Sequence, residues 1–412
     1  MFNKVVTHFK NEHLYRNSLY MMASTGVLAL SGFIFWIVAA HFFSTNSVGI
    51  ATALISAITL IGGFSQLGFN ISLIRFLPNS NEADEMILSS YLLVFLASII
   101  GSLLFILGLP IFAPDLIFLN SNLIYIITFT IFVCAIAINS VLDSTYMAYR
   151  TSENVLIKNT IISILKLVFL FLLTSFGAYG LFSSVSLATT IGVFVSMSVL
   201  FYRLEIKPRF KINKKIVKDM AAYSVGNYIS GFLYQIPTLI LPLVIINKLN
   251  ATFAAYFYID SMILNLLVII PLATSQILLA EGSHDLTQIK TNLFKSIKIT
   301  FITLVPAIII IFFFGNILLQ FFGKSYEADA FHFLQIISLS AVFISITLFC
   351  NSILRLYHEL KLLIILNLIG AIIIILACFI SVPYGLVGVG YGWLIGQILT
   401  ALLFLFSTRK HI

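Results

Sequence analysis

The chain has 412 residues, of which 60% are hydrophobic and only 9% are charged, and its mean hydropathy is +1.09. A soluble globular domain carries roughly 25% charged residues, so this composition excludes a protein that is surrounded mainly by water. The formal net charge is +8. In a membrane protein such a basic excess usually marks the cytoplasmic loops, so it does not by itself indicate binding to nucleic acid.

Apolar runs of about 20 residues, the length that crosses a hydrocarbon core of roughly 30 Å, follow one another along the chain. We predict an all-α membrane protein with about twelve transmembrane helices, at 19–43, 48–74, 87–109, 123–148, 154–176, 180–202, 222–247, 251–279, 293–315, 331–354, 362–381 and 385–407. The first run is longer than the roughly 7–15 apolar residues of a cleaved signal peptide, so we expect it to remain as the first span.

The positive charges test this topology. With twelve spans and a cytoplasmic N-terminus, 20 of the 23 Lys and Arg residues fall in segments on the cytoplasmic side. Lys248 and Lys324 fall in outer loops, and Lys166 falls inside a span. The positive-inside rule predicts this asymmetry, so we expect both termini in the cytoplasm and the protein in the bacterial inner membrane.

The densest basic segment, Arg203–Lys218, lies halfway along the chain. We therefore predict an N-terminal six-helix lobe (1–207), a basic cytoplasmic linker (208–221) and a C-terminal six-helix lobe (222–412). Two halves that both begin in the cytoplasm are a layout known in several transporter folds. The linker mixes apolar and basic residues as a helix on anionic lipid does, although ordinary cytoplasmic charge also explains this mixture.

The polar gaps are too short to hold a catalytic domain, even in the longest outer loops near 110–122 and 316–330. The seven histidines are scattered without the spacing of metal ligands. Gly323-Lys324-Ser325 ends like a phosphate-binding loop, but Leu318 stands where that motif needs glycine. We therefore expect a transporter rather than an enzyme, with no metal or nucleotide cofactor and no nucleic-acid partner.

Among the ionisable residues inside predicted spans, three stand out, namely Asp143, Lys166 and Asp260. Each costs several kcal/mol in hydrocarbon unless it is paired or solvated, so these residues are the best pointers to function. Asp143 lies about 9 residues before the turn expected near Thr151–Ser152, and Lys166 lies about 14 after it, which gives a depth offset of about 7–8 Å. Because side chains lean toward the N-terminus of their own helix, we predict that Asp143 and Lys166 approach each other. They would form either part of a polar cavity or a pair that only holds the bundle together.

Asp260 lies near the middle of the eighth predicted span, where Tyr256, Tyr258 and Asn265 are close enough in sequence to satisfy it. Two interpretations remain open for this carboxyl group. It would bind a proton, Na⁺ or sugar hydroxyls, or it would be a hydrogen-bonded structural acid.

The seventh predicted span contains Gly226, Gly231, Pro237 and Pro242. Proline removes a backbone hydrogen bond and kinks a helix, and glycine lets it bend, so these residues predict a hinge of the kind that an alternating-access transporter needs. Kinked helices also occur without such a role. The polar residues that share this span and are predicted to face a cavity are Asn227, Tyr228, Tyr234 and Gln235.

Several segments of the chain resemble a known family. VGIATALISAITLIGGFSQLGFNISLIRFLP (Val48–Pro78), LDSTYMAYRTSENVLIKN (Leu142–Asn159) and AYFYI…IIPLATSQILLAEGS (Ala255–Ser283) are similar to segments of Wzx-type polysaccharide flippases. These flippases belong to the multidrug/oligosaccharidyl-lipid/polysaccharide exporter superfamily. The resemblance implies two six-helix lobes around a central cavity that opens alternately to each side. It also implies export, without ATP, of an undecaprenyl-pyrophosphate-linked oligosaccharide.

In this interpretation Lys166 attracts the pyrophosphate. Arg75, Arg150 and Lys158 either help at the inner mouth of the cavity or are ordinary cytoplasmic charges. Outward movement of about two negative charges is favoured by an inside-negative potential, at about 2.3 kcal/mol per charge per 100 mV. Coupling to H⁺ or Na⁺ is therefore allowed but not required.

The predicted function is a flippase for the repeat unit of an O-antigen, capsule or exopolysaccharide, with membrane lipids and other polysaccharide assembly proteins as further partners. The alternative is an H⁺- or Na⁺-coupled drug or metabolite antiporter of the same superfamily. Such an antiporter should carry an acidic cluster in one lobe, whereas Asp143 and Asp260 lie in different predicted lobes. A glycan polymerase would need a large outer loop, which the sequence does not contain.

Overall fold

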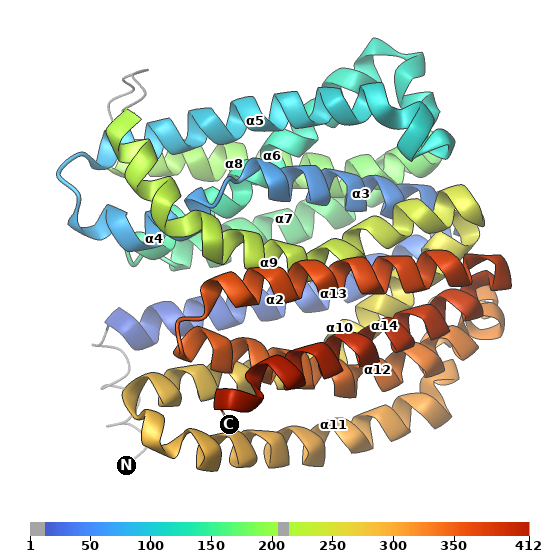
Figure 1. The fold of residues 1–412 in the computed structure, drawn as a ribbon. Helices are drawn as coiled ribbons and strands as arrows, with labels where there is room; N and C mark the ends of the chain where they lie inside the picture. Colours follow the sequence, from blue (N-terminus) through green and yellow to red (C-terminus); the bar gives the residue numbers. More distant parts are fainter. Residues whose placement is uncertain (1–12, 205–213, 412) are drawn as a thin grey trace, which may run out of the picture. The chain divides into compact units, whose positions relative to one another are not determined.

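The computed structural model describes residues 13–204 and 214–411. These residues form helices joined by short turns and contain no strand (Figure 1). Eleven stretches among them are long and apolar enough to cross a membrane, and the last, Leu360–Thr408, holds two helices separated by a 3-10 turn. The prediction of an all-α membrane protein with about twelve spans is therefore confirmed.

Contacts divide the chain into two compact units, each with its own core. Unit 1 is Leu54–Tyr228 with the described part of Met1–Phe43, and unit 2 is Ser44–Ala53 with Ile229–Ile412. The division thus falls within a helix, Lys214–Lys248. The predicted linker 208–221 lies partly outside the described residues and is helical from Lys214 onward.

The elements of the first half of the chain are α2 (His13–Phe42), α3 (Thr45–Ser65), α4 (Phe69–Phe76), η1 (Leu77–Asn79), α5 (Ala83–Phe112), η2 (Pro114–Ser121), α6 (Leu123–Ala148), α7 (Glu153–Leu172), η3 (Thr174–Phe176) and α8 (Gly177–Leu204). Those of the second half are α9 (Lys214–Lys248), α10 (Ala251–His284), η4 (Leu286–Gln288), α11 (Ile289–Gln320), α12 (Lys324–Leu356), α13 (Leu360–Ser381), η5 (Val382–Tyr384), α14 (Gly385–Thr408) and η6 (Arg409–His411).

The second predicted span, 48–74, is interrupted in the structure. Leu67 and Gly68 have φ angles of 51° and 81°, which end α3 and begin α4. Glycine is required at position 68, because a Cβ there would lie 2.9 Å from the hydroxyl of Ser224 and the left-handed backbone would be strained. The continuous apolar pattern gave no sign of this break. Irregular backbone at membrane depth is tolerated only where it is buried in protein or lines a water-filled space.

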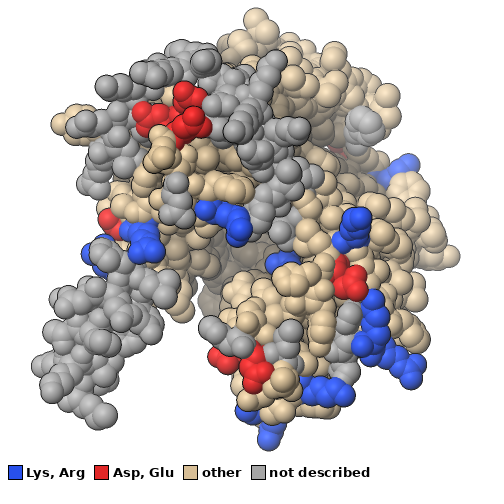
Figure 2. Space-filling view, turned by 60° about the vertical axis from the view of Figure 1, so that its left-hand side comes forward, with Lys and Arg blue, Asp and Glu red and all other residues tan. Residues whose placement is uncertain are grey.

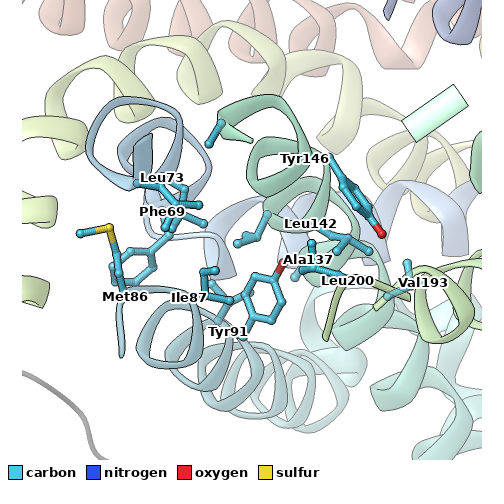
Figure 3. Close-up of a cluster of buried hydrophobic side chains, with 14 of the residues drawn as sticks. Phe69, Leu73, Met86, Ile87, Tyr91, Ala137, Leu142, Tyr146, Val193 and Leu200 are labelled. Carbon is cyan, nitrogen blue, oxygen red and sulfur yellow. The ribbon is translucent and has the colours of Figure 1, made fainter. Parts of the chain in front are cut away.

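The core of unit 1 packs α4, α5, α6 and α8 together. Figure 3 shows Phe69 and Leu73 of α4 beside Ile87 and Tyr91 of α5. The hydroxyl of the buried Tyr91 is hydrogen-bonded, because it lies 3.0 Å from the hydroxyl of Thr145. This core fixes α6, which carries Asp143.

The core of unit 2 surrounds α12, which contacts α10, α11 and α14. Phe257 of α10 packs on Phe333 of α12 with ring centroids 5.7 Å apart, and on Trp393 of α14 at 6.4 Å. The indole N–H of Trp393 donates to the Ser340 hydroxyl at 3.0 Å. Asp260 lies one turn along α10 from Phe257, so this apolar packing surrounds the only acid that is buried in unit 2 among the described residues.

The two halves of the chain repeat the same turns. Arg150 after α6 and His358 after α12 have φ angles of 56° and 57°, and Gly177 before α8 and Gly385 before α14 have 56° and 73°. Each pair is separated by 208 positions. The chain therefore contains an internal repeat of the segments from α6 to α8 and from α12 to α14, although sequence identity between them is weak.

A buried hydrogen bond repeats with the turns. Asn159 of α7 donates to the hydroxyl of Ser24 on α2 at 2.8 Å. Asn367 of α13, which is 208 positions further along, donates to the hydroxyl of Ser230 on α9 at 3.0 Å. This hydrogen bond therefore joins α7 to α2 in unit 1 and α13 to α9 in unit 2.

Unit 2 also holds the first residues of α3. A Cβ on Gly49 would lie 1.6 Å from the carbonyl oxygen of Ala251 at the start of α10. Only glycine allows this approach, so the backbones of the two helices touch there.

We predict that Gly49→Ala destabilises the protein by about 1–3 kcal/mol, because the two backbones must move apart. Gly231→Ala is the matched control, since a Cβ there meets nothing within 4 Å and should cost nothing or add up to about 1 kcal/mol of helix stability. A thiol-reactive dye reports thermal unfolding through the buried cysteines Cys134, Cys350 and Cys378. Equal unfolding midpoints for the two variants would contradict the close contact.

Candidate functional site

The ion pair between α6 and α7 is the central charged contact of unit 1. The Nζ of Lys158 lies 2.5 Å from Oδ1 of Asp143 and also donates to Oδ1 of Asn139. The Lys158 side chain is fully buried, whereas that of Asp143 is 23% exposed. A buried lysine therefore neutralises a carboxylate that still reaches solvent.

The geometry of the hairpin explains this partner. Asp143 and Lys158 are nearly equidistant from the turn at Arg150–Thr151, so the two side chains lie at the same depth. Lys166 lies eight residues further along α7, which adds about 12 Å. Of the two alternatives left open for Asp143 and Lys166, the ion pair is therefore not formed, and Asp143 pairs with Lys158 instead. Lys158 was expected either at the inner mouth or as an ordinary cytoplasmic charge, and the structure shows its side chain wholly buried in this pair.

Lys166 is buried against α2. Its Nζ lies 5.7 Å from the ring centroid of Phe35, and the residue is 8% exposed. In the described part of the chain it forms no hydrogen bond or ion pair. The face of a phenyl ring stabilises a cation only weakly, by about 0.5–2 kcal/mol, so the charge of Lys166 remains available to an anion.

A polar seam holds α2 beside Lys166. The amide N–H of Ser152 donates to Asn17 at 3.0 Å, and the hydroxyls of Ser31 and Ser163 lie 2.8 Å apart. Together with the hydrogen bond from Asn159 to Ser24, these contacts follow Asn17, Ser24 and Ser31, seven residues apart on α2. Such small polar contacts are typical of helix packing in membranes, and they fix the register of the two helices.

Asp260 in unit 2 is fully buried. Neither of its carboxyl oxygens has a hydrogen-bond partner among the described residues. The expected partners Tyr256, Tyr258 and Asn265 therefore do not satisfy it, and the Tyr256 hydroxyl donates instead to Asp329 at 3.1 Å. The buried Tyr326 hydroxyl, which interacts electrostatically with Asp260, likewise has no hydrogen bond.

A lone carboxylate in an apolar core is costly unless it takes up a proton or a cation. In the residues that the structure describes, no three His, Cys, Asp or Glu side chains come together to hold a metal ion.

The residues predicted on the seventh span are placed as follows. Helix α9 runs without interruption through Gly226, Gly231, Pro237 and Pro242, and both prolines are buried. Tyr234 and Gln235 are exposed, and the side chain of Asn227 lies outside the described residues. The hinge and the cavity role of these residues stay predictions.

Arg75 and Arg150 are exposed at the predicted cytoplasmic end of unit 1. Arg75 lies in the last turn of α4, and Arg150 lies in the turn between α6 and α7. Figure 2, which brings that end of the molecule forward, shows Lys and Arg side chains interspersed with Asp and Glu.

Comparison with known proteins identifies the family. The family model described as polysaccharide biosynthesis protein matches residues 14–275, and the MatE model matches residues 244–380. The chain belongs to the polysaccharide biosynthesis protein family. An uncharacterized membrane protein of Methanocaldococcus jannaschii is 25% identical over 433 residues, covering 97% of this chain and 99% of that protein.

Solved structures share the fold of this family member. An inward-facing multidrug resistance MATE family transporter of the MOP superfamily is 18% identical, covers 96% of this chain and 94% of its own, and has a TM-score of 0.63. A MOP superfamily transporter from Pyrococcus furiosus, noted for a binding pocket of reverse polarity, is 17% identical, covers 97% and 95%, and has a TM-score of 0.60. This polysaccharide biosynthesis family protein is therefore a multi-pass membrane transporter of the MOP (multidrug/oligosaccharidyl-lipid/polysaccharide exporter) superfamily.

Two polar residues of this family member's site were missed from the sequence. Asn139 lies one turn before Asp143 on the same face of α6, a spacing that was visible. Gln66 lies in the break between α3 and α4, where it accepts a hydrogen bond from Ser140 at 3.1 Å. Its position could not be foreseen, because the break itself had no sequence signal.

For this member of the family, we predict that Asp143→Asn and Lys158→Met each lower stability by about 2–4 kcal/mol, somewhat less than for a wholly buried pair because Asp143 reaches solvent. This corresponds to roughly 2–5 °C in the unfolding midpoint of a chain of this length. The double variant should recover at least half of the summed loss, since neither charge is then left unpaired. Lys166→Met serves as the control, and its effect should add to that of Asp143→Asn. Coupling of Asp143 to Lys166 instead of Lys158 would contradict the observed pair.

Proposed function

We propose that this transporter is a flippase that moves an undecaprenyl-pyrophosphate-linked oligosaccharide from the cytoplasmic to the outer face of the bacterial inner membrane. The observation that carries the proposal is Lys166, a buried lysine whose ammonium group lies over the ring of Phe35 and forms no hydrogen bond or ion pair with the residues that the structure describes. A buried cation without an acidic partner costs several kcal/mol, so its retention fits a site that receives an anion. The match to the polysaccharide biosynthesis family over residues 14–275 supports a glycan-linked anion.

The chemistry of such a substrate explains what the protein must supply. The pyrophosphate and the glycan cannot cross hydrocarbon unaided, whereas the lipid tail need not leave it. A transporter therefore has to offer one cation for the pyrophosphate and polar groups for the sugars, in a space that contains water. Arg75 and Arg150 would attract the anion at the cytoplasmic end of unit 1. The cavity roles of Tyr234 and Gln235, both exposed on α9 in unit 2, belong to the same proposal.

Alternating access would require one helix to bend while the units reorient. Helix α9 passes from unit 1 into unit 2, and it contains Gly226, Gly231, Pro237 and Pro242. These residues are the proposed hinge, because glycine and proline lower the cost of bending a helix. The product would be a repeat unit of an O-antigen, capsule or exopolysaccharide, handed on to other polysaccharide assembly proteins at the outer face.

The test is flipping in reconstituted vesicles that contain an undecaprenyl-pyrophosphate-linked oligosaccharide. We expect Lys166→Met to lower the flipping rate about 10- to 100-fold, the loss expected for one charge-assisted contact. Lys248→Met is the matched control, because Lys248 also lies over an aromatic ring, that of Phe379 at 5.5 Å, but is exposed at the end of α9. Its rate should stay within about twofold of the parent, a change of less than 0.5 kcal/mol. Unchanged flipping in Lys166→Met would refute the role of this cation.

The second candidate is an H⁺- or Na⁺-coupled antiporter, and the observation that favours it is Asp260 with its two unpartnered oxygens. A carboxyl group that alternates between a bound and a released cation is what ion coupling needs. A flippase driven only by the membrane potential would not need a coupling ion, because the outward movement of about two negative charges is favoured by about 2.3 kcal/mol per charge per 100 mV.

Imposed gradients separate these cases. If Asp260 couples transport to a cation, Asp260→Asn should remove the response of the rate to a pH or Na⁺ gradient while leaving its response to the membrane potential. We expect a roughly tenfold smaller gradient effect in this variant, because each 1.4 kcal/mol of lost coupling is a factor of ten. A response to the potential alone, in parent and variant alike, would show that Asp260 is structural.

A further inference from the structure

One face of α6 is polar and partly exposed. Asn139, Ser140 and Asp143 are all partly exposed, whereas Ala137 and Val141, which lie opposite Asn139 on the helix, are buried. Two amides or carboxylates on one helical face cannot lie against lipid tails at acceptable cost. This face therefore meets water or a polar ligand.

The hydrogen bonds of this face leave a defined set of groups open. The ammonium group of Lys158 donates to Oδ1 of Asp143 and to Oδ1 of Asn139. The side-chain oxygen of Gln66 accepts a hydrogen bond from the Ser140 hydroxyl. Within the described residues, the NH₂ groups of Asn139 and Gln66 and the Oδ2 of Asp143 have no partner, and none of these atoms is sealed from solvent. Two amide donors and one carboxylate acceptor thus remain for a ligand.

The backbone around Gln66 is held in place by unit 1. Leu67 and Gly68, both with positive φ, turn the chain directly after Gln66. Gly68 packs against Ser224, and the hydroxyl of Tyr228 donates to the carbonyl of Gly63. The open amide is therefore presented from a fixed turn rather than from a free loop.

The charge of the cluster decides between ligands. Lys158 and Asp143 cancel, so the cluster has no net charge with which to attract either a pyrophosphate or a cationic ligand. Vicinal hydroxyls of a sugar donate and accept side by side, which suits amide NH₂ groups next to a carboxylate oxygen. We propose that Gln66, Asn139 and Asp143 form a subsite that binds the hydroxyls of a neutral sugar.

This inference rests on the proposed flippase function and separates two tasks within it. Lys166 lies eight residues beyond Lys158 on α7, about 12 Å along the helix. The pyrophosphate and the glycan are thus recognised at different depths of unit 1, by groups of different charge.

The test compares two probes, undecaprenyl pyrophosphate without sugar and undecaprenyl-pyrophosphoryl N-acetylglucosamine, bound to the full-length protein in lipid nanodiscs. We expect Gln66→Met and Asn139→Leu each to weaken binding of the sugar-bearing probe about 5- to 10-fold, by loss of one or two hydrogen bonds. Binding of the sugar-free probe should be unchanged. Gln320→Met is the matched control, since Gln320 is exposed and bonded to Glu327 at the far end of α11.

The outcomes separate the two proposals. Loss of affinity for the sugar-bearing probe alone supports the subsite. Equal affinity of the parent for both probes, or equal weakening of both in the two variants, overturns the subsite and leaves the flippase intact. Binding of neither probe by the parent overturns the proposed function and the subsite with it. Unfolding midpoints near that of the parent confirm that both variants fold.

Discussion

The cost of placing a charge in hydrocarbon governs this molecule. In unit 1 the buried charge of Lys158 is compensated by hydrogen bonds to Asp143 and Asn139. The buried charge of Lys166 is compensated only weakly, by the ring of Phe35. Unit 2 leaves that cost unmet at Asp260, which has no partner among the described residues. Since stability alone would favour apolar residues of similar volume at each position, the unpaired groups are the basis of the binding roles proposed above.

The internal repeat shows that the fold does not need these charges. At the positions that lie 208 residues after Asp143, Lys158 and Lys166, unit 2 has Asn351, Leu366 and Ile374. The hairpin there has the same turn, and the amide of Asn367 bonds to Asn351 at 3.2 Å where unit 1 has an ion pair. The same architecture therefore forms with an amide network in unit 2 and with charges in unit 1. The charges are a specialisation of unit 1, and the lone Asp260 is a specialisation of unit 2.

The sequence was sufficient for the spans because hydrocarbon thickness sets their length. The prediction of a helix at 123–148 agrees with α6, and that of 385–407 differs from α14 by one residue. The break at Leu67 and Gly68 was missed because hydropathy does not report backbone dihedral angles. The sequence offered only Lys166 as a partner for Asp143, because Lys158 lies near the end of its predicted span and reads as a cytoplasmic charge. Its depth matches that of Asp143 only when the turn is centred at Arg150–Thr151, which the hydropathy pattern could not fix to one residue.

Unit 1 thus divides its polar groups by charge. A neutralised cluster around Asp143 and a lone cation at Lys166 lie about 12 Å apart along α7, which suits a ligand that is neutral at one end and anionic at the other. A drug-like cation would be repelled by Lys166, whereas a free phosphate would use Lys166 and not contact the cluster. A lipid-linked glycan presents both chemistries in one molecule. Under the proposed function, the spacing of the two sites, rather than either charge alone, would select this class of substrate.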